Sequence, residues 1–370
     1  MKKLGFGCMR LPMTGGADSH VDLPQFCEMV DSYLAAGFRY FDTAHVYING
    51  ESETALREAL VKRHPRGSFV LTDKLSGSCY DSREEIRPLF ERQLAACGVE
   101  YFDYYLLHAL SAEVYKKVER CRAFEEVCAL RDEGKIRHIG ISFHDRPEVL
   151  ERILREHPEI EVVQIQLNYI DYDSPVIQSG AVYDICRRYD KPVLVMEPVK
   201  GGALADLPAP AQQLLDKAGI ESPAALAIRY AASFGGVMMV LSGMSSTQQM
   251  RDNISHMRDF HPLDEWERQL LGQVRDILKA ESTVPCTGCR YCVPGCPMDI
   301  QIPDLFAAFN AVQRYHDWPS NYYLGLGVQG HGHVSDCVGC RQCESICPQH
   351  LPVTQWLQQV GQALEQSQMN

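Results

Sequence analysis

A repeated cysteine motif near the C-terminus is the feature of this 370-residue chain that most restricts what it can fold into. The spacing C-x2-C-x2-C-x3-C, followed by a proline, occurs twice, and each cysteine of the second copy lies 51 residues after its counterpart in the first. A loop with this spacing lets three thiolates bind the irons of one cubane cluster, whereas the fourth cysteine lies too far round the turn to join them. The eight cysteines are Cys286, Cys289, Cys292 and Cys296 in the first copy and Cys337, Cys340, Cys343 and Cys347 in the second.

The two copies resemble the ligand loops of a bacterial-type 2[4Fe-4S] ferredoxin domain, and the resemblance covers about residues 282–352. In two-cluster ferredoxins the fourth cysteine of each motif ligates the other cluster. The resemblance therefore implies two [4Fe-4S] clusters with exchanged ligands. Cys347 is expected to complete the cluster of the first loop, and Cys296 is expected to complete the cluster of the second loop.

Zinc is the alternative metal for closely spaced cysteines. Structural zinc usually takes two C-x2-C pairs, and it requires neither a third cysteine at the same short step nor a proline after the fourth. The chain departs from the smallest ferredoxins because 40 residues separate Cys296 from Cys337, and we expect the segment 303–315 to add a helix there. The seven scattered cysteines are expected to be reduced, mostly buried thiols; they are Cys8, Cys27, Cys79, Cys97, Cys121, Cys128 and Cys186.

The first 280 residues alternate short apolar runs with amphipathic helical patterns, such as those at 52–63 and 112–134. Eight strand–helix units predict an α/β fold of the (β/α)8, or TIM barrel, type, which needs about 250 residues. We therefore expect a barrel domain over 1–280 and a small ferredoxin-like iron–sulfur domain with a C-terminal tail over 281–370. The eight runs lie at 4–9, 38–44, 69–74, 102–108, 135–142, 162–168, 192–198 and 236–243.

Polar residues occur at the ends of several of these runs, where TIM barrels carry their chemistry. The sequence FDTAHVY at 41–47, the lysine that ends the third run and LLH at 106–108 resemble the aldo-keto reductase superfamily over most of residues 1–280. The resemblance implies an oxidoreductase that transfers hydride between a nicotinamide and a carbonyl or alcohol. It also implies a catalytic tetrad, which consists of Asp42, Tyr47, Lys74 and His108.

These four residue types suit carbonyl reduction on chemical grounds. Hydride transfer to a carbonyl leaves negative charge on oxygen, which needs a proton donor, and a free tyrosine with a pKa of about 10 holds its proton firmly. A nearby ammonium lowers such a pKa, so we expect Tyr47 to be the general acid and Lys74 to tune it. Asp42 is expected to orient the lysine, and His108 to hydrogen-bond the carbonyl oxygen.

The segment LSGMSSTQQMRDN at 241–253 predicts a phosphate site, because a Gly-containing turn leads into a helix N-terminus after the eighth strand. Ser246 and Gln249 have the spacing of a capping box. The resemblance implies nicotinamide cofactor contacts at Ser142, Gln164, Met196, Ser242, Gly243 and Asn253.

The cofactor region also departs from many relatives. Gln249 stands where NADPH-using relatives often have arginine, although Arg251 is near. Phe143 stands where asparagine is common, and Met196 replaces an aromatic ring that stacks on the nicotinamide. The choice between NADP(H) and NAD(H) therefore stays open, and a bound flavin is not excluded.

Composition narrows the class of partner. The formal charge of −12 argues against nucleic acid, whose binding depends on Lys and Arg neutralising phosphates. No apolar run approaches the roughly 20 residues of a membrane helix, and the N-terminus has no apolar region typical of a signal peptide. We therefore expect a cytoplasmic protein with a small carbonyl or alcohol substrate and, as a possible electron partner, a ferredoxin or flavoprotein.

Three functions fit these observations. The first is an NAD(P)(H)-dependent carbonyl reductase whose clusters are structural or redox-sensing. The second is an electron-transfer oxidoreductase in which a ferredoxin or a flavin exchanges electrons with the clusters. The third is a noncatalytic barrel used as a redox-responsive interaction module, which the intact tetrad disfavours.

Overall fold

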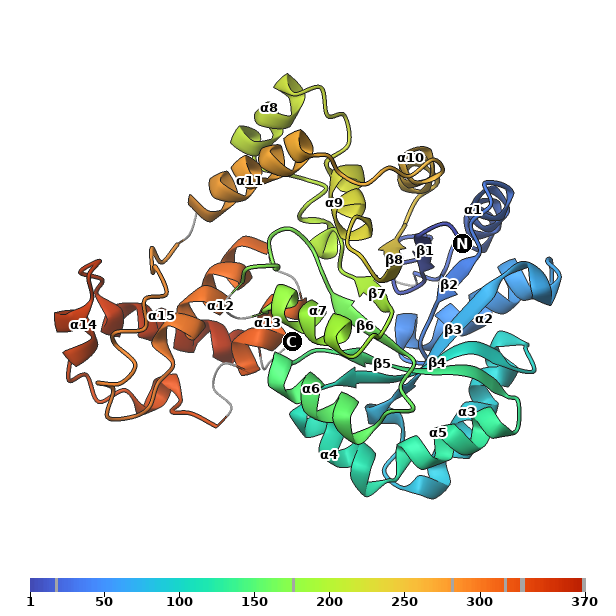
Figure 1. Cartoon of the computed structure of the whole chain (residues 1–370), viewed down its shortest axis with the longest axis horizontal. Coiled ribbons are helices and arrows are strands. Elements are labelled where there is room, and N and C mark those ends of the chain that lie inside the picture. The colour runs from blue at the N-terminus through green and yellow to red at the C-terminus, as the bar shows by residue number, and fades with distance from the viewer. Residues whose placement is uncertain (17–18, 175–176, 281–282, 316–317, 327–329, 368–370) are drawn as a thin grey trace.

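The protein is described from a computed structural model, over residues 1–16, 19–174, 177–280, 283–315, 318–326 and 330–367. Eight parallel strands form a closed barrel in which neighbours in sequence are neighbours in space, and β8 pairs with β1 (Figure 1). The predicted (β/α)8 barrel is confirmed. The strands are β1 Leu4–Gly7, β2 Tyr40–Asp42, β3 Val70–Ser76, β4 Phe102–Leu110, β5 Ile136–Phe143, β6 Val162–Gln166, β7 Val193–Met196 and β8 Val237–Gly243.

Helices surround the barrel and cover the outer faces of its strands (Figure 1). Helix α11 packs on α8 and leads toward the C-terminal part of the chain. The barrel helices are α1 Leu23–Ala35, α2 Glu51–Leu56, α3 Arg83–Cys97, α4 Ala112–Arg120, α5 Ala123–Asp132, α6 Pro147–Glu156, α7 Ser179–Arg188, α8 Ala209–Lys217, α9 Pro223–Ala232, α10 Thr247–Met257 and α11 Glu265–Ala280.

Two apolar layers stabilise the barrel. One fills its interior with side chains that include Tyr40, Leu106 and Met239, and the other lies between the strands and the helices. The close packing leaves no room at Gly140, where an added Cβ would lie 2.5 Å from Leu106 and 2.7 Å from the Val162 carbonyl oxygen. Only glycine fits a strand position that neighbouring backbone approaches so closely.

Helix starts follow the capping signals of the sequence. The side chains of Asp22, Ser111, Ser222 and Ser246 each accept a hydrogen bond from a first-turn backbone N–H, which satisfies a group that the helix itself leaves unpaired. The helical pattern at 112–134 is divided into α4 and α5, because Arg122 takes a left-handed conformation with φ of 51°. The pattern at 52–63 begins as α2 and continues as a π-helical turn at Arg57–Val61.

The C-terminal part has an apolar core of its own, built from residues between Val284 and Ala363. Helices α12 and α15 pack together in it, and α12, at Ile302–Tyr315, confirms the predicted helix between the two cysteine loops. The remaining helices are α13 Trp318–Leu326, α14 Gln342–Ile346 and α15 Val353–Ser367.

The 51-residue repeat of the cysteine motifs is also a repeat of backbone conformation. Left-handed residues occur at Gly288, Arg290 and Asp299 in the first copy, and at Gly339, Arg341 and His350 in the second. Each member of the second set lies 51 positions after its counterpart. The two loops therefore have the same turn geometry, as equivalent ligand loops require.

The C-terminal part contacts the barrel near the carboxyl ends of its strands. Tyr323 and Leu326 of α13 form a buried apolar group with Ile177, which precedes α7. The hydroxyl of Tyr322 hydrogen-bonds to Ser111, the N-cap of α4, and its ring lies 6.2 Å from that of His144. No helix in the described part of the chain combines the length and the apolar content needed to cross a bilayer.

Candidate active site and iron–sulfur loops

The four residues predicted as a tetrad lie together at the carboxyl ends of β2, β3 and β4. Lys74 Nζ lies 2.6 Å from Asp42 Oδ1, 2.7 Å from the Thr43 carbonyl oxygen and 3.2 Å from the Tyr47 hydroxyl. The rings of Tyr47 and His108 meet edge to face, with centroids 5.8 Å apart. The lysine is 1% exposed, so its charge depends on these partners and not on water.

The loop after β2 holds Tyr47 in place. Thr43 hydrogen-bonds to Ser52 at 2.7 Å, and Ser52 in turn donates to the Cys8 carbonyl oxygen. The backbone directly after Tyr47 is left-handed at three successive residues, 48 to 50, with φ between 51° and 89°. Such a conformation is costly for residues other than glycine, so the surrounding contacts must stabilise it.

His108 lies at a break in strand pairing. The register between β4 and β5 shifts between Leu107 and Leu110, and Ala109 takes a φ of 55°. Its backbone N–H donates to Ser142 Oγ at 2.7 Å. A bulge of this kind redirects a side chain, and here it aims His108 at Tyr47.

The electrostatics keep the lysine charged and the tyrosine protonated. Burial alone lowers the pKa of Lys74, but Asp42 and Tyr47 outweigh this effect and the net pKa is raised. Burial raises the pKa of Tyr47 above its ordinary value, although Lys74 acts in the opposite direction. Lys74 thus lowers the pKa of Tyr47, as expected, but burial and the Asp42 carboxylate have the larger combined effect and the net pKa is raised.

His108 is neutral at physiological pH. Burial lowers its pKa well below the ordinary value, and the positive charge of Lys74 lowers it further. Ser76 Oγ lies 2.7 Å from His108 Nδ1 and fixes the orientation of the ring. Burial also lowers the pKa of His144, to about 4. Neither imidazole therefore competes with Lys74 as a cation.

The residues expected to hold a nicotinamide surround the same mouth of the barrel. Gln164 is 2% exposed, and its Oε1 has no hydrogen-bond partner among the described residues. A buried amide oxygen in this state fits a ligand that carries an N–H donor, such as a carboxamide. Ser142 accepts from Ala109 and keeps its own hydroxyl proton to donate. Met196 ends β7 beside Gln166.

The expected phosphate region is formed by β8 and α10. Asn253 Nδ2 donates to Ser242 Oγ at 2.9 Å, and both side chains are buried. Ser246 accepts from the Gln249 backbone N–H, but the Gln249 side chain accepts from Ser245, so the predicted capping box is formed on one side only. Gly243 is exposed at the strand end.

Two arginines differ in their relation to this region. Arg251 is exposed and pairs with Glu28 at 3.2 Å, so it is directed toward α1. Arg10 lies beside Gly243, and its carbonyl oxygen accepts from Ser245 at 3.2 Å. Arg10 is thus a cationic residue beside the expected phosphate region, and no motif in the sequence points to it.

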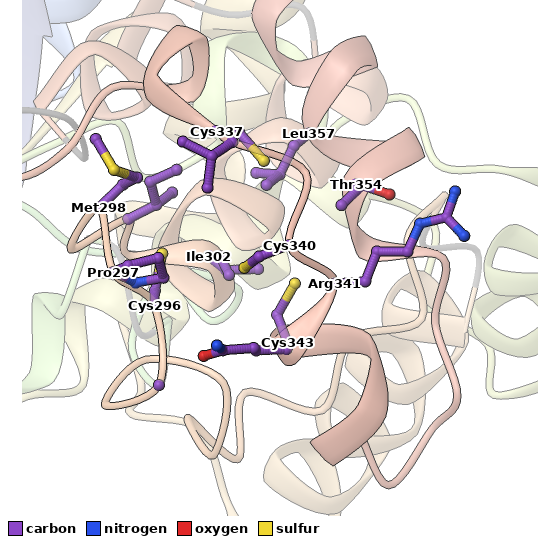
Figure 2. Close-up of a pocket in the computed structure, with 14 residues that line it drawn as sticks. Cys296, Pro297, Met298, Ile302, Cys337, Cys340, Arg341, Cys343, Thr354 and Leu357 are labelled. Atoms are coloured by element: carbon purple, nitrogen blue, oxygen red, sulfur yellow. The ribbon is translucent and has the colours of Figure 1, made fainter.

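The eight motif cysteines line two hollows in the C-terminal part, four to each. Cys286, Cys289, Cys292 and Cys347 line one, and Cys296, Cys337, Cys340 and Cys343 line the other. Figure 2 shows the second hollow, with side chains from both loops around one space. Each hollow combines three cysteines of one motif with the fourth of the other, which is the donor set of an exchanged pair of cubane clusters.

Several residues of the site are not apparent as site residues from the sequence. Ser76 could have been found, because it lies two positions after Lys74 and so shares its strand face. His144 and Tyr322 belong to different parts of the chain, and no local pattern links them. The seven other cysteines form no disulfide, and four of them are buried, as expected.

Comparison with known proteins identifies both parts. The profile of the aldo/keto reductase family matches residues 3–275, and the profile of a 4Fe-4S dicluster domain matches residues 285–351. An aldo-keto reductase of Mycolicibacterium smegmatis is 30% identical over 213 residues, which are 57% of this chain and 71% of that protein. Human aldo-keto reductase family 1 member C1 is 28% identical over 285 residues, covering 69% of this chain and 82% of the relative.

Solved structures agree with the barrel. The holo form of an aldo-keto reductase from Bacillus halodurans superposes with a TM-score of 0.59 and 26% identity, covering 74% of this chain and 91% of that one. A Klebsiella pneumoniae aldo-keto reductase in complex with NADPH superposes with a TM-score of 0.58 over 74% of this chain and 90% of its own. At 20% identity, the second similarity concerns the fold alone.

Proposed function

This chain belongs to the aldo/keto reductase family and carries a C-terminal 4Fe-4S dicluster domain, and we propose that it is an NAD(P)(H)-dependent oxidoreductase that reduces an aldehyde or ketone, or oxidises the alcohol. The observation that carries the proposal is the position of Lys74 Nζ, in contact with both Asp42 and the Tyr47 hydroxyl. We take the barrel to extend to about residue 280, where α11 ends.

Tyr47 is the proton donor in this proposal. A bound reduced nicotinamide supplies the hydride, and the Tyr47 hydroxyl gives its proton to the oxygen that gains charge. Lys74 stabilises the resulting phenolate at 3.2 Å, and Asp42 keeps the lysine charged. The phenol is protonated at neutral pH, and the charge of Lys74 favours the phenolate that forms when the proton is given up. In alcohol oxidation Tyr47 is the base.

His108 positions the carbonyl. The neutral ring donates a hydrogen bond from Nε2 to the substrate oxygen, provided that the proton is held on that nitrogen. In this proposal the Ser76 hydroxyl, 2.7 Å from Nδ1, donates to that nitrogen and leaves the ring proton on Nε2. The donor is fixed before the substrate arrives, so little reorganisation accompanies the reaction.

Replacing Ser76 by alanine is expected to lower kcat about 3- to 10-fold, the effect of one hydrogen bond. Without the hydroxyl, the proton of His108 redistributes between its two nitrogens and the carbonyl loses part of its donor. Steady-state kinetics with one aldehyde, compared with Ser78→Ala in the exposed turn that follows β3, tests this. Equal kcat for the two variants contradicts the role given to Ser76.

The cofactor contacts proposed are Ser142, Gln164 and Met196 at the nicotinamide, with Ser242, Gly243 and Asn253 near the phosphates. The support is the unpartnered Gln164 Oε1 and the Ser242–Asn253 contact. Arg10 is a cation available to a phosphate beside Gly243. The choice of NADP(H) or NAD(H) is tested by the anaerobic titration with both nucleotides.

We further propose that the two hollows hold two [4Fe-4S] clusters with exchanged fourth ligands. Cys347 lines the hollow of the first loop and Cys296 that of the second, which supports this assignment. The repeated left-handed turns give both loops the same form.

A second candidate function is electron transfer between the clusters and the barrel site, with a ferredoxin or flavoprotein as the outside partner. The contact between the two parts favours it. The ring of Tyr322 in α13 lies 6.2 Å from that of His144, which directly follows β5. Tyr315, the last residue of α12, places its ring 4.7 Å from Lys200 Nζ in the loop after β7. The cluster-bearing part thus reaches the mouth where the tetrad lies.

The test is an anaerobic titration of reconstituted protein with NADPH and then NADH, followed by cluster absorbance and electron paramagnetic resonance. The same samples then receive an aldehyde, and alcohol formation is measured. Alcohol formation with unreduced clusters supports the carbonyl reductase. Reduction of the clusters by either nucleotide supports the electron-transfer function, and the nucleotide that acts identifies the cofactor.

A further inference from the structure

A second group of buried ionisable side chains lies behind the tetrad, on the outer face of β3. Asp73 precedes Lys74 and faces α2 and α3, where it meets Glu53 and Cys97. A carboxylate oxygen of each acid and the Cys97 sulfur lie within 4.8 Å of one another. Each of the three residues is at most 1% exposed, so a charge there receives no solvation from bulk water.

Two of the four carboxylate oxygens of Asp73 and Glu53 lie within hydrogen-bond distance of a nitrogen atom. Asp73 Oδ1 accepts from the Lys74 backbone N–H at 2.7 Å and from Gln93 Nε2 at 3.1 Å. The orientation of Gln93 is fixed, because its Oε1 accepts from the Tyr105 hydroxyl at 2.5 Å. Glu53 Oε2 lies 3.0 Å from His45 Nδ1.

The other two oxygens lack a strong donor. Asp73 Oδ2 lies 3.8 Å from Cys97 Sγ, and a thiol is a weak donor. Glu53 Oε1 has no partner among the nitrogens and hydroxyls of the described residues. Two buried carboxylates this close cannot both be ionised without large repulsion, and one proton between them gives each remaining oxygen a partner.

The directions of the pKa shifts agree with a retained proton. Burial raises the pKa of Asp73 well above its ordinary value, and the charge of Glu53 raises it further. Burial raises the pKa of Glu53 to about 7.

We propose that Glu53 and Asp73 share one proton at neutral pH, and that this carboxyl pair positions Lys74 and Tyr47 by joining strand β3 to the loop that carries the tyrosine. Asp73 holds the backbone N–H of Lys74, and Glu53 holds His45, two residues before Tyr47. Both acids are positioning residues, and their effect on turnover rests on the function proposed above.

Two neighbours of the pair do not titrate near neutrality. Cys97 and Tyr105 face it from α3 and β4, and burial raises the pKa of both well above their ordinary values. Lys74 and Asp42 lie on the inner side of the barrel wall and neutralise each other. His45 is the remaining titratable neighbour; its side chain is 32% exposed and connects Glu53 to solvent.

The shared proton is tested by infrared spectroscopy of the intact holoprotein at pH 7.5, with metal analysis of the same samples. We expect a buried carboxylic-acid C=O band that Asp73→Asn removes and that Glu53→Gln shifts in frequency, because the proton then bonds to a different partner. Asp103→Asn is the matched control, because Asp103 is a buried acid on β4 whose partners are Arg66 and Arg137; it should keep the band. Absence of the band in the parent overturns the proposal. The proposal is also overturned if metal analysis finds a divalent cation in addition to the cluster iron and Asp73→Asn removes that cation.

The positioning role is tested by kinetics. Asp73→Ala is expected to lower kcat at least tenfold with a smaller change in KM. Asp73→Asn, which can still bond Glu53, is expected to recover most of kcat.

The pH dependence of stability has a definite sign. The stability contributed by Glu53 is complete below about pH 4.5 and is lost as pH rises through about 7. Melting temperatures between pH 5.5 and 8 should therefore fall less in Glu53→Gln than in the parent.

Unchanged kcat in Asp73→Ala, or parallel melting curves for the parent and Glu53→Gln, overturns the positioning role. Failure of the proposed function is distinguishable from failure of this inference, because the infrared band and the metal content do not depend on turnover.

Discussion

Phenylalanine in place of Tyr47 is expected to lower kcat for carbonyl reduction by about 10²- to 10⁴-fold, the usual contribution of a positioned general acid. The substitution removes only the hydroxyl that lies 3.2 Å from Lys74 Nζ, and it leaves the Asp42–Lys74 pair intact. The effect should fall on kcat, because the proton is needed only as charge develops on the carbonyl oxygen.

The control is Tyr183→Phe. The Tyr183 hydroxyl donates to the Gly235 carbonyl oxygen, next to the N-terminal end of β8 and so at the opposite end of the barrel from the tetrad. Its removal costs one hydrogen bond and should leave kcat within about twofold. If Tyr47→Phe turns over as fast as Tyr183→Phe, Tyr47 is not the acid.

Lys74→Met tests the same mechanism, but its effect on activity is combined with an effect on stability. It should also abolish turnover, but it leaves Asp42, which is 3% exposed, without its cation. Breaking a buried ion pair in this way typically destabilises a protein by about 3–5 kcal/mol. Loss of activity in Lys74→Met must therefore be read together with its thermal stability, whereas Tyr47→Phe can be read directly.

The barrel was predictable because each of its strands is a short apolar run that must be covered on both sides. All eight strands start within two residues of their predicted starts, and every one overlaps its run. The tetrad was predictable for a related reason: residues at the carboxyl ends of adjacent parallel strands necessarily meet. Asp42 and Lys74 are such residues, and they form an ion pair at 2.6 Å.

Contacts between elements that carry no shared pattern could not be predicted. Glu53 and Asp73 are ordinary charged residues in sequence, and only the packing of α2 on β3 makes them a buried pair. The net pKa shift of Tyr47 depends on burial, which a motif does not report. The helical periodicity of the sequence likewise does not predict the break at Arg122, because the amphipathic pattern continues on both sides of it.

The cysteine motifs predict an exchange of ligands that can be measured by iron content. Cys347→Ala and Cys289→Ala are each expected to lower the iron of the reconstituted protein from about eight atoms to about four. The two cysteines line the same hollow, although they belong to different motifs. The double variant should therefore also keep about four irons, because both substitutions damage one cluster.

A double variant with one substitution in each hollow is expected to lose both clusters. Cys340 lines the other hollow, so Cys340→Ala combined with Cys347→Ala should remove both clusters and both signals in electron paramagnetic resonance. Cys128→Ala, in a half-buried thiol of α5, should retain all the iron. If each motif instead held its own cluster, Cys289→Ala with Cys347→Ala would remove all the iron, and Cys340→Ala with Cys347→Ala would leave half. The two double variants thus decide the ligand assignment without reference to activity, and the single variants then show whether turnover in the barrel depends on either cluster.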